Sequence, residues 1–213
     1  MFQTNGLLIQ LLVLLLSYLI GSITTGDIVA HFKKVDLRGQ GSGSIGATNV
    51  FRAMGWFYAA IVLVGDALKG IIAVILGGKL IGIIGGFDFA ILTGIAAIIG
   101  HNWPIYTGFR GGKGIATSFG VIIGLTSKSL LIVLPTWIIF FGATGFVSLA
   151  SILAAISYPI SVYFSYNGDY YKLGFSVVIA VLAIYRHKSN LQRLLHGKEH
   201  RILYNKRKEA DKR

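Results

Sequence analysis

The chain has 213 residues, of which 54% are hydrophobic and only 13% are charged. Its apolar runs are long enough to cross a bilayer, which excludes a soluble globular protein and indicates a polytopic membrane protein. It has no cysteine, and its five histidines lack a zinc-like spacing, so we expect no metal and no cofactor. The net charge of +12 lies mainly beside apolar segments and in the tail, so we expect anionic lipid headgroups as partners and no nucleic acid.

The apolar segments predict an all-α fold of about seven transmembrane helices, forming a single domain over residues 1–213. The uncharged stretch 129–166 is too long for one span, and we expect a turn within residues 145–151. Two segments are shorter than the usual span, so a re-entrant pair or a thinned membrane remains open for residues 115–127 and 173–185. The predicted spans are Gly6–Val29, Trp56–Leu80, Ile83–Trp103, Ile115–Ser127, Leu130–Ser148, Leu149–Tyr166 and Leu173–Tyr185.

Basic residues predict the orientation of these spans. With seven spans, 16 of the 20 lysines and arginines share one side of the membrane. The positive-inside rule then places the amino terminus outside and the carboxyl terminus in the cytoplasm. The same count places three polar segments on the cytoplasmic face: residues 41–52, 100–114 and 186–190. Glycines 78, 82 and 86, and also 120 and 124, have the spacing of close helix packing.

The first polar segment matches the pattern Gly-x-Gly-x-x-Gly at residues 41–46, with Asp66 twenty residues further on. A dinucleotide site is excluded because no strand precedes the glycines and Asp66 lies inside a predicted span. The segment instead predicts a flexible loop that leads into a helix. Ser42, Thr48 and Asn49 would offer hydrogen-bond donors to a phosphate, and Arg52 would offer a planar fork. Simple helix capping is the alternative.

The second polar segment resembles a P-loop at residues 111–113, but Gly114 stands where Ser or Thr would bind magnesium. Nucleotide hydrolysis is therefore not expected. Lys113 stands at the start of the next predicted helix, among glycines that let backbone N–H groups approach an anion. A flexible turn with two more cytoplasmic charges is the alternative.

The third polar segment begins a basic, amphipathic cytoplasmic tail at about residues 187–213, which we expect to lie on anionic headgroups. His187 and Asn190 are three residues apart, so they share a helical face where uncharged polar groups do little for lipid anchoring. Asp66 and Lys69, inside a span, are expected to pair with each other or to line a polar cavity. The pattern His-x-x-x-x-Asp at residues 31–36, used by acyl-CoA-dependent acyltransferases, is expected to be a chance match.

Five motifs follow one another along the chain: Gly-Ser-Gly-Ser-Ile-Gly-Ala-Thr-Asn-Val-Phe-Arg at 41–52, Asp-x-x-Lys-Gly at 66–70, Gly-His-x-x-Pro at 100–104, Phe-Arg-Gly-Gly-Lys-Gly-Ile-Ala-Thr at 109–117 and Arg-His-x-x-Asn at 186–190, the last continuing to Glu199. In this order they resemble the acyl-phosphate-dependent glycerol-3-phosphate acyltransferases of bacteria, the PlsY family. Ser44 departs from the family, which usually has Asn there.

The resemblance implies transfer of a fatty acyl group from acyl phosphate to the 1-hydroxyl of glycerol 3-phosphate. The products would be lysophosphatidic acid and inorganic phosphate, in the first step of phospholipid synthesis at the bacterial inner membrane. Our hypothesis is that Arg52 and Lys113 bind phosphate groups, that Ser42, Thr48 and Asn49 add donors, and that His187 and Asn190 position the glycerol phosphate. Lys113, His187 and Asn190 are the predicted catalytic residues.

The resemblance also suggests that a substrate phosphate takes the proton, although His187 remains a candidate base. Two alternatives stay open. One is an acyltransferase that uses acyl-CoA or acyl carrier protein, and the other is an anion or lysolipid transporter. A transporter would be expected to show a sequence repeat with a midplane site, and we find no such repeat.

Overall fold

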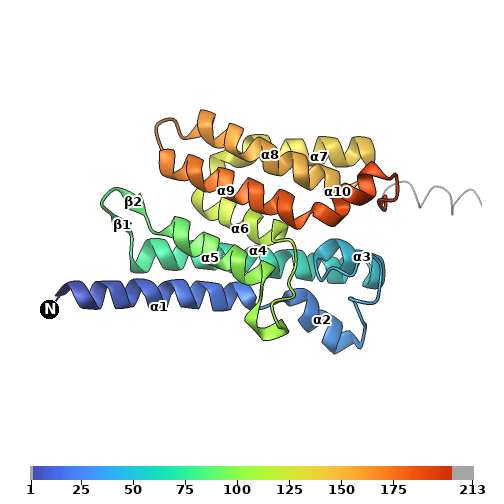
Figure 1. Cartoon of the computed structure of the whole chain (residues 1–213), viewed down its shortest axis with the longest axis horizontal. Helices are drawn as coiled ribbons and strands as arrows, with labels where there is room; N and C mark the ends of the chain where they lie inside the picture. Colours follow the sequence, from blue (N-terminus) through green and yellow to red (C-terminus); the bar gives the residue numbers. More distant parts are fainter. Residues whose placement is uncertain (1, 203–213) are drawn as a thin grey trace, which may run out of the picture. The chain divides into compact units, whose positions relative to one another are not determined.

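The computed structural model describes residues 2–202, and within them the chain is mostly helical. It divides into two compact units, residues 1–127 and 128–213 (Figure 1). Each of the seven predicted spans overlaps one α-helix or more. The tail residues 203–213, predicted to continue the amphipathic segment, lie outside the described residues.

The first unit is built around one long central helix. This helix, α4, packs against every other α-helix of the unit (Figure 1). It matches its predicted span, and at about 1.5 Å per residue it is long enough to cross a bilayer core. The helices of the unit are α1 Phe2–Ser22, α2 Thr25–Lys33, α3 Ala47–Met54, α4 Trp56–Leu80, α5 Ala90–Asn102 and α6 Ile115–Leu125, with a 3-10 turn η1 at Ile105–Thr107.

The predicted first span, Gly6–Val29, is not one continuous helix. The chain leaves helical geometry at Ile23 and Thr24, between α1 and α2. The Lys69 side chain, from α4, donates a hydrogen bond to the carbonyl of Ile23 at 2.8 Å. A tertiary contact therefore satisfies a carbonyl that the interrupted helix leaves without an intrahelical partner.

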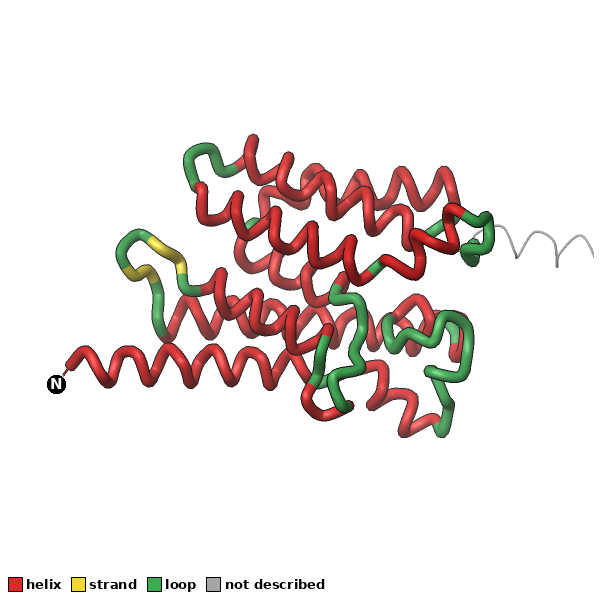
Figure 2. Tube along the Cα trace, viewed as in Figure 1, coloured by secondary structure: helices red, strands yellow, loops and turns green. Residues whose placement is uncertain are grey.

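A small hairpin departs from the predicted all-α fold. Strand β1, Ile83–Ile84, pairs antiparallel with β2, Phe87–Asp88, and is drawn in yellow in Figure 2. Gly85 and Gly86 have φ of +57° and +83°, which are left-handed angles suited to a tight hairpin turn. The helix predicted from Ile83 consequently begins only at Ala90.

The two predicted sets of packing glycines have different outcomes. A Cβ atom on Gly120 would overlap the Ala67 carbonyl of α4, and one on Gly124 would lie 2.9 Å from Val74. Close packing of α6 on α4 at these positions is therefore confirmed. The prediction is wrong for residues 78, 82 and 86, because a Cβ on Gly78 meets nothing within 4 Å and α4 ends at Leu80, before the other two.

The second unit is a set of antiparallel helices in which α8 packs against α7 and α9 (Figure 1). The turn predicted within residues 145–151 is confirmed at Gly145, which ends α7 with φ +73° and donates its N–H to Phe141 O. Its helices are α7 Leu130–Thr144, α8 Val147–Ser165, α9 Tyr170–Arg186 and α10 Lys188–Leu195, after a 3-10 turn η2 at Ser127–Ser129.

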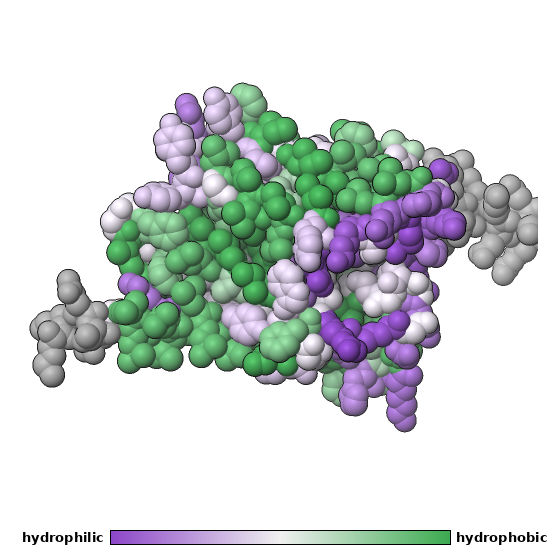
Figure 3. All heavy atoms as spheres, in the orientation of Figure 1, coloured by the Kyte–Doolittle hydropathy of each residue, from purple (hydrophilic) through white to green (hydrophobic). Residues whose placement is uncertain are grey.

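Four segments of the described chain are long and apolar enough to span a membrane: Gly6–Lys33, Trp56–Leu80, Ser127–Thr144 and Val147–Ser165. The visible surface over α1 consists mainly of hydrophobic side chains, and hydrophilic ones gather over the end of α2 and the loop after it (Figure 3). With 13, 11 and 17 residues, α5, α6 and α9 are shorter than these four. The count of seven spans therefore stays a prediction.

Candidate active site

The loop that joins α2 to α3 is shaped by Asn49. This side chain is only 1% exposed. Its Oδ1 accepts a hydrogen bond from the backbone N–H of Ser42 at 2.9 Å, and its Nδ2 donates to the carbonyls of Leu37 and Gln40 at 3.0 Å each. Both amide hydrogens are therefore used within the loop. Asn49 therefore shapes the loop, and its predicted donation to a phosphate stays a prediction.

Other predicted donors of this segment remain near its surface. Ser42 and Thr48 are half-buried, and Thr48 lies in the first turn of α3, whose N-cap is Gly46. Arg52 is half-buried in the last turn of the same helix, and a Cβ on Gly41 would lie 3.7 Å from its Cδ. The Arg52 side chain thus passes beside the glycine-rich turn.

The loop between α5 and α6 is packed so closely that it requires glycine. Gly112 donates its N–H to His101 O at 3.1 Å, and Cβ atoms on Gly111 and Gly112 would overlap the backbone and ring of His101. Gly114 has φ +80°, and Phe109 has φ +62°, which is costly for an aromatic residue. The strain and the close approach fix the path of the chain toward Lys113.

Lys113 stands one residue before the N-cap of α6, Gly114, and its side chain is half-buried. The amino end of a helix carries a partial positive charge and unpaired backbone N–H groups. A lysine at this point adds a full charge to an anion-binding geometry. The predicted placement of Lys113 at a helix start is confirmed.

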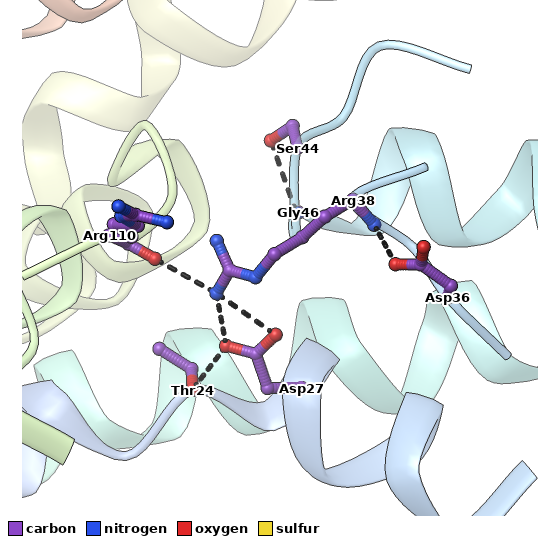
Figure 4. Close-up of polar contacts among 7 residues, drawn as sticks. All are labelled: Thr24, Asp27, Asp36, Arg38, Ser44, Gly46 and Arg110. Carbon is purple, nitrogen blue, oxygen red and sulfur yellow. Dashed lines mark hydrogen bonds and ion pairs between the residues drawn. The ribbon is translucent and has the colours of Figure 1, made fainter. Parts of the chain in front are cut away.

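One arginine connects the two loops of the first unit (Figure 4). The guanidinium Nη2 of Arg38 lies 3.0 Å from Asp27 Oδ2 and donates to the carbonyl of Arg110 at 3.0 Å. Thr24 donates its hydroxyl to the same Asp27 carboxylate, and the Arg38 backbone N–H is held by Asp36. Arg38 therefore ties the loop before α3 to the loop before α6.

A buried polar cluster lies beneath the second loop. The ammonium of Lys69 is 3.0 Å from Asp66 Oδ1 and 2.8 Å from His101 Nδ1. Thr25 donates its hydroxyl to Asp66 at 3.0 Å. The predicted pairing of Asp66 with Lys69 is confirmed, and the pair is almost fully buried at 1% and 5% exposure.

In the second unit, His187 and Asn190 are both buried, at 2% and 3% exposure. His187 is the junction residue between α9 and α10, and Asn190 lies in the first turn of α10. The ring Nδ1 of His187 lies 2.8 Å from Ala183 O. Because a carbonyl only accepts, Nδ1 carries a proton, and in the neutral ring Nε2 is the basic nitrogen.

Glu199 folds back onto this junction and holds Asn190. Its Oε1 accepts from Asn190 Nδ2 at 2.8 Å and from the Ser148 hydroxyl at 3.0 Å, and its Oε2 accepts from Arg193 Nε at 2.7 Å. Burial raises the pKa of Glu199, but the hydrogen bonds from Asn190, Arg193 and Ser148 outweigh it and bring the pKa below its ordinary value. Asn190 Oδ1 is buried without a hydrogen-bond partner. The amide thus presents an unused acceptor.

The structure therefore groups the predicted site residues in two sets, one in each unit. A family model described as glycerol-3-phosphate acyltransferase matches residues 11–197, a range that contains both sets. The chain belongs to the glycerol-3-phosphate acyltransferase family.

Relatives within this family align over nearly their whole length. Proteins named glycerol-3-phosphate acyltransferase from Desulforudis audaxviator and Aquifex aeolicus are 46% and 42% identical, covering 92% and 90% of this chain and 97% and 98% of their own. The crystal structure of PlsY, an integral membrane glycerol 3-phosphate acyltransferase, in its glycerol 3-phosphate form superposes with a TM-score of 0.85 at 41% identity, covering 91% of this chain and 95% of that one. Its lysophosphatidic acid form gives 0.82 at 40%, with the same coverage.

The His31 pattern has no support in this acyltransferase. His31 is exposed, and Asp36 Oδ1 accepts from the backbone N–H groups of Arg38 and Gly39. Asp36 thus shapes a turn. Sequence reasoning missed the bridge from Asp27 to Arg38, because the two residues are eleven positions apart and no local pattern links them.

Proposed function

We propose that this acyltransferase moves a fatty acyl group from acyl phosphate to the 1-hydroxyl of sn-glycerol 3-phosphate. The observation that carries the proposal is the family match over residues 11–197, which contain both glycine-rich loops and the His187–Asn190 junction. Each substrate bears a phosphate, so the protein must hold two anions together and screen their repulsion. The geometry of the loops supports this role.

Arg52 and Lys113 are the cations proposed to bind the two phosphates. Each lies beside a glycine-rich turn, and Lys113 adds its charge to the amino end of α6. Half-burial strengthens their attraction for an anion relative to bulk water. The hydroxyls of Ser42 and Thr48 complete the donor set, while Asn49 and Arg38 maintain the shape of the loops.

His187 and Asn190 are proposed to recognise the glycerol part. Asn190 contributes Oδ1, a buried acceptor, and the neutral form of His187 adds a second acceptor to the site at Nε2. Hydroxyl groups are the donors of glycerol 3-phosphate, so acceptors suit them, whereas phosphate calls for donors and cations. The proposed assignment of acceptors to the glycerol hydroxyls, and of cations to the phosphate, follows from the chemistry of the two ends of the substrate.

The proposed reaction is a direct transfer. The 1-hydroxyl oxygen bonds to the acyl carbon, and the bond between that carbon and the phosphate oxygen breaks. The hydroxyl proton passes to the departing phosphate, so hydrogen phosphate and lysophosphatidic acid leave. Because acyl phosphate already carries a good leaving group, no acyl-enzyme intermediate is required.

We further propose that seven helices cross the inner membrane, with the amino terminus outside and both glycine-rich loops at the cytoplasmic face. The asymmetric distribution of lysine and arginine supports this orientation. The helices α5 and α6 are short for a span. They fit either a locally thinned bilayer or helix ends that lie within the bilayer and are covered by other parts of the protein. The basic tail is proposed to rest on anionic headgroups.

A transfer assay tests the donor. Purified protein receives glycerol 3-phosphate with either acyl phosphate or acyl-CoA, beside Lys113→Ala and the matched control Lys79→Ala, an exposed lysine in the last turn of α4. We expect lysophosphatidic acid to form with acyl phosphate as donor and not with acyl-CoA. This activity should be retained in Lys79→Ala and lost in Lys113→Ala. Product from acyl-CoA alone would overturn the donor assignment, and no product from either would favour transport.

A further inference from the structure

The buried cluster of Asp66, Lys69 and His101 contains a charge pair inside an apolar helix, where charges are costly. A purely structural role needs only that the two charges neutralise each other. The cluster also includes His101, which does not take part in neutralising the pair. His101 lies in the last turn of α5, directly before the loop that carries Lys113. That continuity connects α4 to the proposed phosphate site.

The hydrogen-bond inventory of Lys69 determines the state of the histidine. An ammonium has three N–H donors and no acceptor. Its three partners are Asp66 Oδ1 at 3.0 Å, Ile23 O at 2.8 Å and His101 Nδ1 at 2.8 Å. With Lys69 charged in its ion pair with Asp66, His101 Nδ1 accepts its hydrogen bond, so the ring is neutral and its proton is on Nε2.

The opposite edge of the ring faces the second loop. A Cβ on Gly112 would overlap His101 Nε2, so this nitrogen lies against the backbone one residue before Lys113. The carbonyl of His101 also accepts the Gly112 N–H at 3.1 Å. Ring and main chain of one residue thus support the same turn, and Lys69 fixes the ring.

We propose that Asp66, Lys69 and His101 are positioning residues for Lys113, holding the Nε2-protonated imidazole beneath Gly112 so that the loop keeps its anion-binding shape. This inference rests on the proposed function, since Lys113 must act on a phosphate for its position to matter. Asp66 orients Lys69, Lys69 selects the tautomer of His101, and His101 supports the loop. None of the three needs to touch substrate.

Two histidine variants separate the two edges of the ring. In His101→Asn the amide reaches the position of Nδ1 and can still accept from Lys69, but nothing replaces Nε2 against Gly112. In His101→Gln the longer amide places an N–H near the position of Nε2. We expect His101→Gln to stay within roughly threefold of wild-type kcat/KM, and His101→Asn to lose about 100-fold, the cost of misplacing a reacting group by about 1 Å.

A charge-free double variant tests the pair itself. Asp66→Asn with Lys69→Met removes both charges, keeps an acceptor for Thr25, and should leave thermal stability near wild type because buried ion pairs are often replaceable by uncharged groups. We expect kcat/KM to fall at least about tenfold, with unchanged activity in the control Lys79→Met. If the double variant is folded and fully active, the positioning role is wrong. If it does not fold, the histidine pair decides: equal activities of the two variants overturn the proposal.

The tautomer has a readout independent of turnover. In protein labelled with ¹⁵N-histidine, the His101 signals, identified by their loss in His101→Gln, should show a protonated Nε2 and an unprotonated Nδ1, and this pattern should be lost in the double variant. If the wild-type protein shows no transferase activity, the proposed function is refuted. The spectrum then still tests whether Lys69 sets the tautomer of His101. A proton on Nδ1 in active wild type would overturn the positioning proposal alone.

Discussion

Replacing Glu199 by Ala tests whether the segment after α10 maintains the His187–Asn190 junction. The Glu199 side chain is 4% exposed and accepts hydrogen bonds from Asn190, Ser148 and Arg193. Removing it leaves three donors without their acceptor, one of them a guanidinium. Breaking a buried charged pair typically costs about 3–5 kcal/mol.

For a chain of this size, each kcal/mol corresponds to about 2–4 °C in melting temperature, so Glu199→Ala should melt roughly 6–20 °C lower. The matched control is Lys198→Ala, which removes the neighbouring exposed side chain and should melt with wild type. The assay is thermal unfolding in one detergent at one protein concentration. Turnover at a temperature where the variant is folded should also fall, because Asn190 loses the partner that orients its amide.

The dependence on pH follows from the lowered pKa of Glu199. A carboxyl whose folded pKa lies below its unfolded value stabilises the fold fully above the unfolded pKa, and this contribution is lost as the pH falls through the folded pKa. The stability difference between wild type and Glu199→Gln should therefore be constant between about pH 6 and 8, and shrink below about pH 4. A melting temperature of Glu199→Ala within about 1 °C of wild type would refute the reasoning.

Three further predictions concern the first unit. Asn49→Ala should cost about 2–4 kcal/mol of stability, measured by thermal unfolding, because it removes hydrogen bonds to three backbone groups in a buried setting; an unchanged melting curve would contradict the loop-shaping role. Gly120→Ala should disrupt the packing of α6 on α4, since its Cβ would overlap Ala67 O, and we expect a lower melting temperature, whereas Gly142→Ala, which meets nothing within 4 Å, should behave as wild type. Arg38→Lys keeps the charge but loses the planar fork that joins the two loops, so it should raise the KM for glycerol 3-phosphate a few-fold. Stability should change little, because an exposed ion pair contributes at most about 1 kcal/mol. A large loss of stability without a change in KM would contradict this role of Arg38.

Helix positions could be predicted because long apolar runs and charged interruptions are local properties of the sequence. Trp56–Leu80 is the clearest case, since its ends are set by Gly55 and by the glycines after Leu80. The break at Ile23 and Thr24 could not be predicted from composition, because both sides are apolar and the stabilising contact comes from Lys69, 46 residues away. The hairpin at residues 83–88 did carry a local signal, the Gly-Gly pair, which the apolar flanks concealed.

The polar residues of the site could be found from sequence, but the direction of their hydrogen bonds could not. Asn49 and Asn190 both looked like ligands of a phosphate or glycerol group. In the fold, Asn49 uses its whole amide on the loop, whereas Asn190 uses only its Nδ2 and leaves Oδ1 as an acceptor. The difference depends on partners such as Glu199, nine residues away, which only the folded chain brings together.

The most direct test of the account is a single-turnover measurement of phosphate release from acyl phosphate, with and without glycerol 3-phosphate. Direct transfer requires the second substrate, so phosphate should appear only when glycerol 3-phosphate is present, in a one-to-one ratio with lysophosphatidic acid. A burst of phosphate equal to the enzyme concentration in the absence of glycerol 3-phosphate would reveal an acyl-enzyme and contradict the account.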